Sequence, residues 1–335
     1  MPLKTLVSVV FAATLVFADQ TVRAEEITLR FEASPRVERL SPQGEPATLA
    51  VTATSSDGRP IAEGWLAVRL DAPPSGFFST DFPLVEGSRL LEMRLPLVNG
   101  KAEWRQVLPI RGAYRLAAEF IGAGGVKKGT VFSFHVYENP RKWLVLGGFA
   151  FGLFITGVIA GRIFSAAKDA PRTQLSFCLL LFVLCGAAAG KWSWAHEEQE
   201  RKYMSKLEIG PAAVGAPARL QWWLHPAGVN GQPSAKLSLT IAHVEMNKVV
   251  FALEKIPVAG EFALDYQFTD GSEYLVTAVA ETGDGETVRQ ERTVSVTAAA
   301  PPLGTKLPPL ILFIAVIAAG LLAGRCSRGV GVSKL

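Results

Sequence analysis

Two hydrophobic patterns alternate along the chain. In some regions apolar and polar residues follow each other with a period of two, which is typical of β-strands with one buried face. Elsewhere apolar residues continue for about twenty positions, which is long enough for a helix to span the hydrocarbon of a bilayer. These runs cover residues 143–163, 174–191 and 307–324, and we predict a transmembrane helix in each.

The first region with a period of two covers residues 25–140 and predicts a β-sandwich of about seven strands. Asn99-Gly100 lies between two apolar segments and is a strong hairpin signal. Short strands, regular turns and the absence of a helix-length run favour an immunoglobulin-like fold. The expected strands are 27–31, 49–53, 65–70, 90–97, 102–108, 114–120 and 131–137.

The second such region covers residues 207–298 and predicts another immunoglobulin-like β-sandwich. Asp270-Gly271 and Asp284-Gly285 supply turns. A charged segment, residues 192–206, precedes it and is predicted to be a solvated stalk. The expected strands are 220–224, 237–244, 249–253, 262–268, 274–281 and 287–296.

The whole chain is therefore predicted to contain two β-sandwiches and three transmembrane helices. The helix after each β region ends alike, in Ala160-Gly161-Arg162 and in Ala323-Gly324-Arg325. This echo is consistent with an internal duplication.

The first 24 residues have the features of a secretory signal peptide. Lys4 supplies the positive charge, and the apolar stretch that follows is too short to span a bilayer. Cleavage after Ala24 is preferred over cleavage after Ala18, and an uncleaved anchor is the alternative. In each case the region from Glu25 onward is exported.

Charge near the apolar runs predicts how the chain lies in the membrane. The loop 164–173 and the tail 325–335 carry an excess of Lys and Arg, which marks cytoplasmic segments. Both β regions then lie in the periplasm of a bacterial inner membrane. The chain contains no Asn-X-Ser/Thr sequon, which agrees with a bacterial envelope.

Composition supports a membrane protein and argues against nucleic-acid binding. A hydrophobic content of 49% and a mean hydropathy of +0.25 are too high for an ordinary soluble protein. The pI is near 9.0, but there is no Lys/Arg-rich run, and several basic residues flank the apolar segments. The three cysteines lie outside the β regions, so neither region is predicted to hold a disulfide.

Glycines recur at four-residue spacing in all three apolar runs. Such pairs let helix backbones approach closely, so we expect helix–helix assembly within the chain or with another subunit. The alternative is the general enrichment of glycine in membrane helices. The pairs are Gly148 and Gly152, Gly157 and Gly161, Gly186 and Gly190, and Gly320 and Gly324.

An irregular segment, residues 73–87, interrupts the first β region. It contains Phe77, Phe78, Asp81 and Phe82, and exposed aromatic residues of this kind mark interaction surfaces. One interpretation is a docking loop for a partner or for lipid headgroups. The other is a loop that folds over the end of the sandwich. No histidine stands near Asp81 in sequence to act as a base for the hydroxyls of Ser79 and Thr80, so we predict no acid–base catalysis and no enzyme.

Histidine and methionine are the candidate metal ligands of an exported β domain. His135 stands alone, and His243 and Met246 are three positions apart, which on a strand places them on opposite faces. A metal site would have to be assembled from distant segments. We therefore predict no metal and no cofactor.

Two resemblances bear on the fold. The motif Gly-X-Tyr-X-Leu at Gly112, Tyr114 and Leu116 resembles a late-strand entry of bacterial immunoglobulin-like domains, in which the tyrosine hydroxyl fixes a corner. The β regions also resemble the YtkA-like modules of bacterial envelope proteins.

The layout of leader, β domain, helical hairpin and β domain resembles the B subunit of particulate methane and ammonia monooxygenases. That family's copper site uses a His at the mature N-terminus and a His-X-His pair. Here the mature chain starts at Glu25, and His135 has no histidine two residues away. The copper role is therefore not carried over.

From the sequence we expect a non-enzymatic envelope protein, an accessory or assembly subunit of a membrane complex. Its expected partners are the lipid bilayer and other membrane or periplasmic subunits. One alternative is a periplasmic copper- or metal-handling protein. The other is a ligand- or glycan-binding module that uses Trp222, Trp223 and the loop from Phe77 to Phe82.

Overall fold

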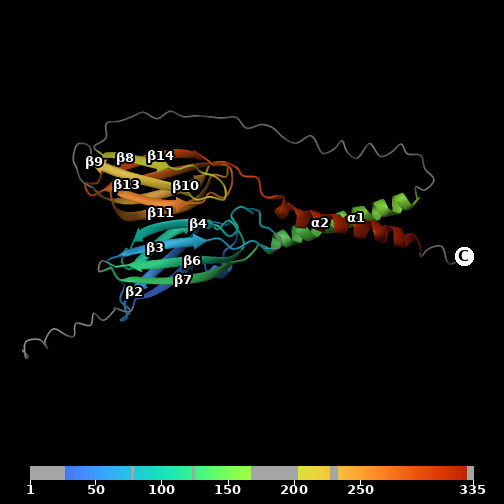
Figure 1. The fold of residues 1–335 in the computed structure, drawn as a ribbon, viewed down its shortest axis with the longest axis horizontal. Coiled ribbons are helices and arrows are strands. Elements are labelled where there is room, and N and C mark those ends of the chain that lie inside the picture. Colours follow the sequence, from blue (N-terminus) through green and yellow to red (C-terminus); the bar gives the residue numbers. More distant parts are fainter. Residues whose placement is uncertain (1–26, 77–78, 123–124, 167–202, 227–232, 330–335) are drawn as a thin grey trace, which may run out of the picture.

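The computed structural model describes residues 27–76, 79–122, 125–166, 203–226 and 233–329. These form a two-layered β body from which two helices project at one end (Figure 1). The prediction of a mostly β chain with apolar helices is confirmed for this part of the chain. The predicted signal peptide, the predicted helix 174–191 with Gly186 and Gly190, and the side chains Phe77 and Phe78 lie outside the described residues.

Each half of the described chain consists of seven strands followed by one long helix. The first half contains β1 (Thr28–Ser34), β2 (Ala47–Thr54), β3 (Trp65–Asp71), β4 (Arg89–Pro96), β5 (Lys101–Gln106), β6 (Gly112–Ile121), β7 (Lys127–Val136) and α1 (Pro140–Ala166), with a short 3-10 helix, Val37–Arg39, after β1. The second half contains β8 (Tyr203–Ile209), β9 (Ala218–Pro226), β10 (Ser234–His243), β11 (Lys248–Ala259), β12 (Glu261–Tyr266), β13 (Glu273–Thr282), β14 (Thr287–Ser295) and α2 (Leu303–Gly329).

Strand β8 corrects the predicted stalk. Residues 203–206 do not belong to a solvated segment but begin an edge strand in which Tyr203 pairs with Pro226 and Leu207 with Trp222. Leu207 is buried, whereas Met204 and Lys206 are exposed. The charged residues that precede Tyr203 hid this alternation in the sequence.

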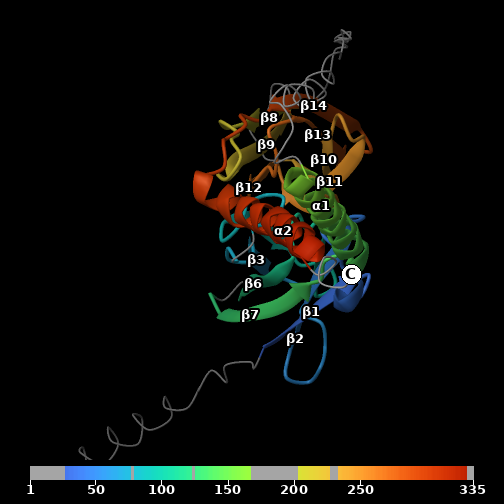
Figure 2. The same cartoon turned by 90° about the vertical axis from the view of Figure 1, so that its right-hand side faces the viewer.

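The two predicted sandwiches are not separate, because each sheet runs through both halves. The sheets are antiparallel, with seven strands each, in the orders β1-β2-β5-β11-β10-β13-β14 and β7-β6-β3-β4-β12-β9-β8. The halves therefore join edge to edge in both layers, at β5 with β11 and at β4 with β12. Figure 2 views the body from the end that carries the helices.

We call these two junctions the seam. In one layer Phe251 pairs with Gln106, and the Val107 N–H donates to the Val250 carbonyl at 2.9 Å. In the other layer Tyr266 pairs with Leu91. There the Gln267 N–H donates to the Leu90 carbonyl, also at 2.9 Å. Side chains from both halves form one buried cluster, so the seam continues through the core.

The halves have the same strand topology, which supports an internal duplication. Within the first half the orders are β1-β2-β5 and β7-β6-β3-β4, and within the second they are β8-β9-β12 and β14-β13-β10-β11. By their places in these orders, β5 of the first half is equivalent to β12 of the second, and β4 is equivalent to β11. At the seam β5 pairs with β11 and β4 pairs with β12, so both junctions join the same two kinds of strand. The body thus resembles a two-fold dimer within one chain.

A buried tyrosine fixes the same corner in each half. The Tyr114 hydroxyl donates to the Ile110 carbonyl at 2.7 Å and accepts from the Ile110 N–H at 3.1 Å. At the equivalent place the Tyr274 hydroxyl donates to the Asp270 carboxylate. Burial raises the pKa of both phenols above their ordinary value, so both stay protonated as donors.

Helices α1 and α2 leave the β body at the same end and pack along each other (Figure 1). The segments Pro140–Ile163 and Leu303–Cys326 are long and apolar enough to cross a membrane. Most of their large side chains face outward; Leu144 is 77% exposed and Leu303 79%. In water, leaving a large apolar side chain exposed instead of buried costs about 1.5–3 kcal/mol of free energy.

Close backbone contact between the helices depends on two of the predicted glycine pairs. A Cβ added to Gly157 would lie 2.7 Å from the Ile317 carbonyl oxygen and 3.1 Å from the Gly320 Cα. A Cβ on Gly161 would collide with Leu321, and one on Gly324 with Val158. Gly148 and Gly152 lie elsewhere on α1, and a Cβ there would meet no atom within 4 Å.

Candidate functional site at the base of the helices

A groove of about 770 Å³ lies where the first half of the β body meets both helices. One end is polar and the other is apolar, which distinguishes it from the buried core. Its polar end is formed by Ser79, Asp81, Arg111, Glu138, Arg141 and Lys142, and its apolar wall by Trp143, Val145, Leu146, Phe149, Pro309, Leu312 and Phe313.

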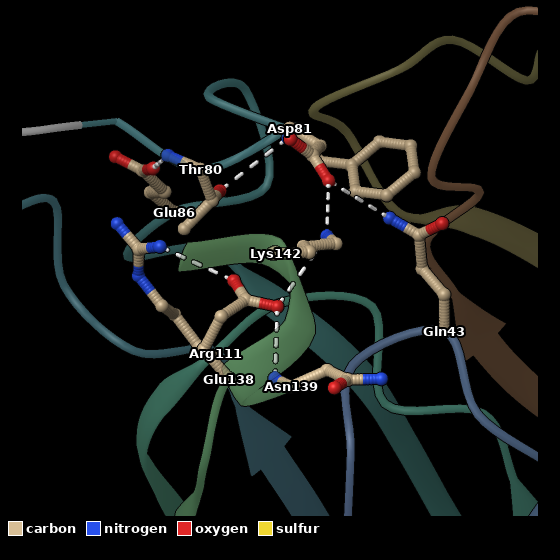
Figure 3. A network of polar contacts seen from close by, with 9 residues as sticks. Gln43, Thr80, Asp81, Glu86, Arg111, Glu138, Asn139 and Lys142 are labelled. Atoms are coloured by element: carbon tan, nitrogen blue, oxygen red, sulfur yellow. Dashed lines mark hydrogen bonds and ion pairs between the residues drawn. The ribbon is translucent and has the colours of Figure 1, made fainter. Parts of the chain in front are cut away.

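An ion-pair network organises the polar end (Figure 3). Lys142 Nζ lies 2.8 Å from Asp81 Oδ2 and 3.4 Å from Glu138 Oε1. Glu138 Oε2 lies 3.2 Å from Arg111 Nη1, and the Glu138 side chain is only 12% exposed. Gln43 Nε2 donates to Asp81 Oδ2 at 3.3 Å. The network therefore ties the loop, the corner before β6 and helix α1 together.

Local sequence explains how α1 begins at this point. Asn139 precedes the helix, and its side-chain oxygen accepts from the Arg141 N–H at 3.0 Å, as an N-cap does. Pro140 occupies the first helical position, which suits its fixed φ. The Arg111 guanidinium carbon lies 5.5 Å from the centre of the Trp143 ring, within range of a cation–π contact.

The described part of the irregular segment is tied to the body by hydrogen bonds and by packing. The Thr80 N–H donates to Glu86 Oε1 at 2.5 Å, and Phe82 is partly buried against the core. Asp81 points to Lys142 and Gln43 (Figure 3). In its described part, the segment thus serves as a brace between the β body and α1.

The three metal candidates do not converge. His243 has both ring nitrogens engaged, because Nε2 lies 3.2 Å from Asp270 Oδ2 and Nδ1 accepts from the Met246 N–H at 3.2 Å. The Met246 side chain is exposed, and His135 lies on the surface with its ring 4.6 Å from that of Tyr137. Within the described ranges, no three His, Cys, Asp or Glu side chains are placed to hold a metal ion.

The paired tryptophans do not form a shared platform for a sugar. Trp222 is buried in the core at 1% exposure. Trp223 is only partly buried, and its ring lies 6.0 Å from Lys206 Nζ. Neighbouring residues of a strand face opposite sides, which explains the division.

A wider groove of about 950 Å³ crosses the seam on the outer face of the sheet that contains β3, β4 and β12. The groove is hollow because small residues, Ala67, Ala117, Gly129 and Ala263, form its floor where longer side chains would fill it. Trp65 at its margin is 46% exposed. Of the described residues that line either groove, none is a histidine or a cysteine.

Comparison with known proteins does not establish a family. No family model and no curated protein matches the chain. A conjugative transposon lipoprotein from Bacteroides eggerthii is 9% identical, with 28% of this chain and 97% of that one covered and a TM-score of 0.21. CopC from Methylosinus trichosporium OB3b is 18% identical, with 30% and 99% covered and a TM-score of 0.23.

The adhesin InvE from Yersinia pseudotuberculosis is 9% identical, with 81% of this chain and 60% of that one covered and a TM-score of 0.22. TM-scores this low assign neither a family nor a function to the chain. The resemblance to YtkA-like modules stated from the sequence has no matching family model.

Proposed function

We propose that this chain is a non-enzymatic envelope protein anchored in a bacterial inner membrane, with both immunoglobulin-like halves in the periplasm. It acts there as an accessory or assembly subunit of a membrane complex. The observation that carries the proposal is that α1 and α2 project from one end of the β body (Figure 1) and that their large apolar side chains are exposed.

The seam supports a third membrane crossing. Strands of the two halves pair directly, so both halves lie on one side of the membrane. Helix α1 leads away from that side and β8 belongs to it again. If α1 spans the bilayer, the chain has to return between residues 166 and 203, and 174–191 is the apolar run in that interval.

The groove across the seam supports docking of a partner. It is concave, its floor is made of small side chains, and strands from both halves line it. A continuous sheet fixes its shape, so a partner would meet a preformed surface, which lowers the entropy cost of binding.

Reporter fusions are expected to show that the two halves share one compartment. Alkaline phosphatase joined after residue 300 should be active, as an exported reporter is, whereas fusions after residues 168 and 335 should be inactive. A green fluorescent protein reporter at the same sites should give the opposite pattern. Cytoplasmic behaviour of the fusion after residue 300 would contradict both the orientation and the accessory role.

Purification in a mild detergent is expected to recover the protein with at least one other subunit. Ala263→Trp, which fills the groove across the seam, should remove that subunit, because Ala263 forms part of the floor. Thr240→Trp is the matched control, since Thr240 is partly buried on a strand of the other sheet. A lone monomer at every protein concentration, from cells that express the chain at native level, would count against the proposal.

A further inference from the structure

The groove at the base of the helices lies where a bilayer would present its headgroups. It begins at Lys142 and Trp143, at the start of the apolar segment of α1, and continues to Phe149. Tryptophan at a helix end is typical of the membrane–water interface. A groove at this level is open to the bilayer and not only to the aqueous phase.

The polar end of the groove has a charge that the described residues do not balance. Its lining contains three cations, Arg111, Arg141 and Lys142, and two carboxylates, Asp81 and Glu138. Both carboxylates are engaged by Lys142, and Glu138 also by Arg111. Among the described residues Arg141 has no carboxylate partner, so its guanidinium is available to an anion. Guanidinium binds phosphate with two parallel hydrogen bonds.

The remaining lining is apolar and comes from both helices. Val145, Leu146 and Leu312 line it, with Phe149 and Phe313 packed edge to face, their ring centres 5.5 Å apart. Pro309, in the first part of α2, also lines this wall. A hydrocarbon chain would lie against these side chains with no polar group to desolvate. The volume is also within the usual range of ligand sites, about 300–1,000 Å³.

We propose that this groove binds one anionic phospholipid, with its phosphate on Arg141 and one acyl chain against the wall formed by Val145, Leu146, Phe149 and Leu312. The ion pairs of Asp81 and Glu138 hold Lys142 and Arg111 on either side of the headgroup. The inference rests on the membrane anchoring proposed above. It adds a specific lipid site at the junction that braces the β body on α1.

Native mass spectrometry of the detergent-solubilised full chain tests the site. After endogenous lipid has been removed, the protein is titrated separately with phosphatidylglycerol, phosphatidylcholine and inorganic phosphate. We expect one phosphatidylglycerol per chain, weaker phosphatidylcholine binding and no retained phosphate. Arg141→Gln should weaken phosphatidylglycerol binding about tenfold, the loss of one charge-assisted contact. Leu146→Trp, which fills the apolar wall, should abolish it.

Arg30→Gln is the matched control, because Arg30 is an exposed arginine on β1, outside the groove lining, and should leave binding unchanged. Equal affinity for both lipids, or equal effects of the two arginine variants, would overturn the inference. So would the absence of bound lipid together with cross-linking of Leu146→Cys to another protein segment. If lipid binding fails while the chain stays in the membrane with its partner, only the lipid site falls. A soluble chain would remove the proposed function as well.

Discussion

Replacing Phe251 by alanine is expected to lower the free energy of unfolding by about 3–5 kcal/mol, as for other large core aromatics, and to weaken both halves together. The Phe251 side chain is fully buried on β11 and its ring centre lies 5.5 Å from that of Tyr266 on β12. Because Phe251 also pairs with Gln106 of the first half, the cavity would open at the seam. Denaturant unfolding in detergent measures the loss.

Hydrogen exchange read by mass spectrometry reports each half separately in the same experiment. Amides of β2 and β6 should lose protection together with those of β10 and β13, although Phe251 belongs to the second half. The exposed residue Val131 is the control, and Val131→Ala should change stability by less than about 0.5 kcal/mol. Two separate unfolding transitions, of which Phe251→Ala shifts only that of the second half, would mean that the halves unfold independently.

Substitution of Gly157 by leucine is expected to separate the two helices, whereas leucine at Gly152 should leave them paired. The first side chain would overlap the Ile317 carbonyl and the Gly320 backbone, at a cost of about 1–3 kcal/mol if the helices shift. The second would point to open space. Both changes replace glycine by leucine on α1, so the gain in helix propensity, about 0.8–1 kcal/mol, is similar.

Thermal unfolding in mild detergent and one distance measurement distinguish these outcomes. Spin labels at Ile163→Cys and at native Cys326 lie near the far ends of the two helices, in a background with alanine at Cys178 and Cys185. Gly157→Leu should lower the melting temperature and lengthen the label distance, and Gly152→Leu should do neither. Equal effects of the two variants would show that the glycine contact does not hold the helices together.

Most strands of the β body could be predicted because each carries its own alternating pattern. Asn99-Gly100 and the tyrosine of the Gly-X-Tyr-X-Leu motif likewise act through neighbours in sequence. The seam could not be predicted in this way. On β5 the alternation Lys101, Ala102, Glu103, Trp104 describes any strand with one buried face, and nothing in it says which strand lies alongside. That choice depends on the packing of two distant edges at once.

The contacts of the candidate site could not be predicted from local sequence either. The sequence singled out Asp81 because it stands among aromatic residues, but its partner Lys142 follows 61 residues later and carries no local signal. Arg111 and Glu138 were missed for the same reason. Among the glycines, the spacing of Gly148 and Gly152 is identical to that of Gly157 and Gly161. Only the crossing of α1 with α2 decides which pair is in contact.

Both seam junctions pair the same two kinds of strand, and both helices contribute a glycine pair to their contact. This symmetry bears on how such a chain could arise. A primitive chain with one β domain and one membrane anchor could form the same assembly as two identical copies. Both copies would then end in the cytoplasm and begin outside it. Fusing their genes would leave the second copy's β domain in the cytoplasm unless the junction supplied another membrane-spanning segment. The extra hydrophobic run between the repeats is what such a fusion would have needed.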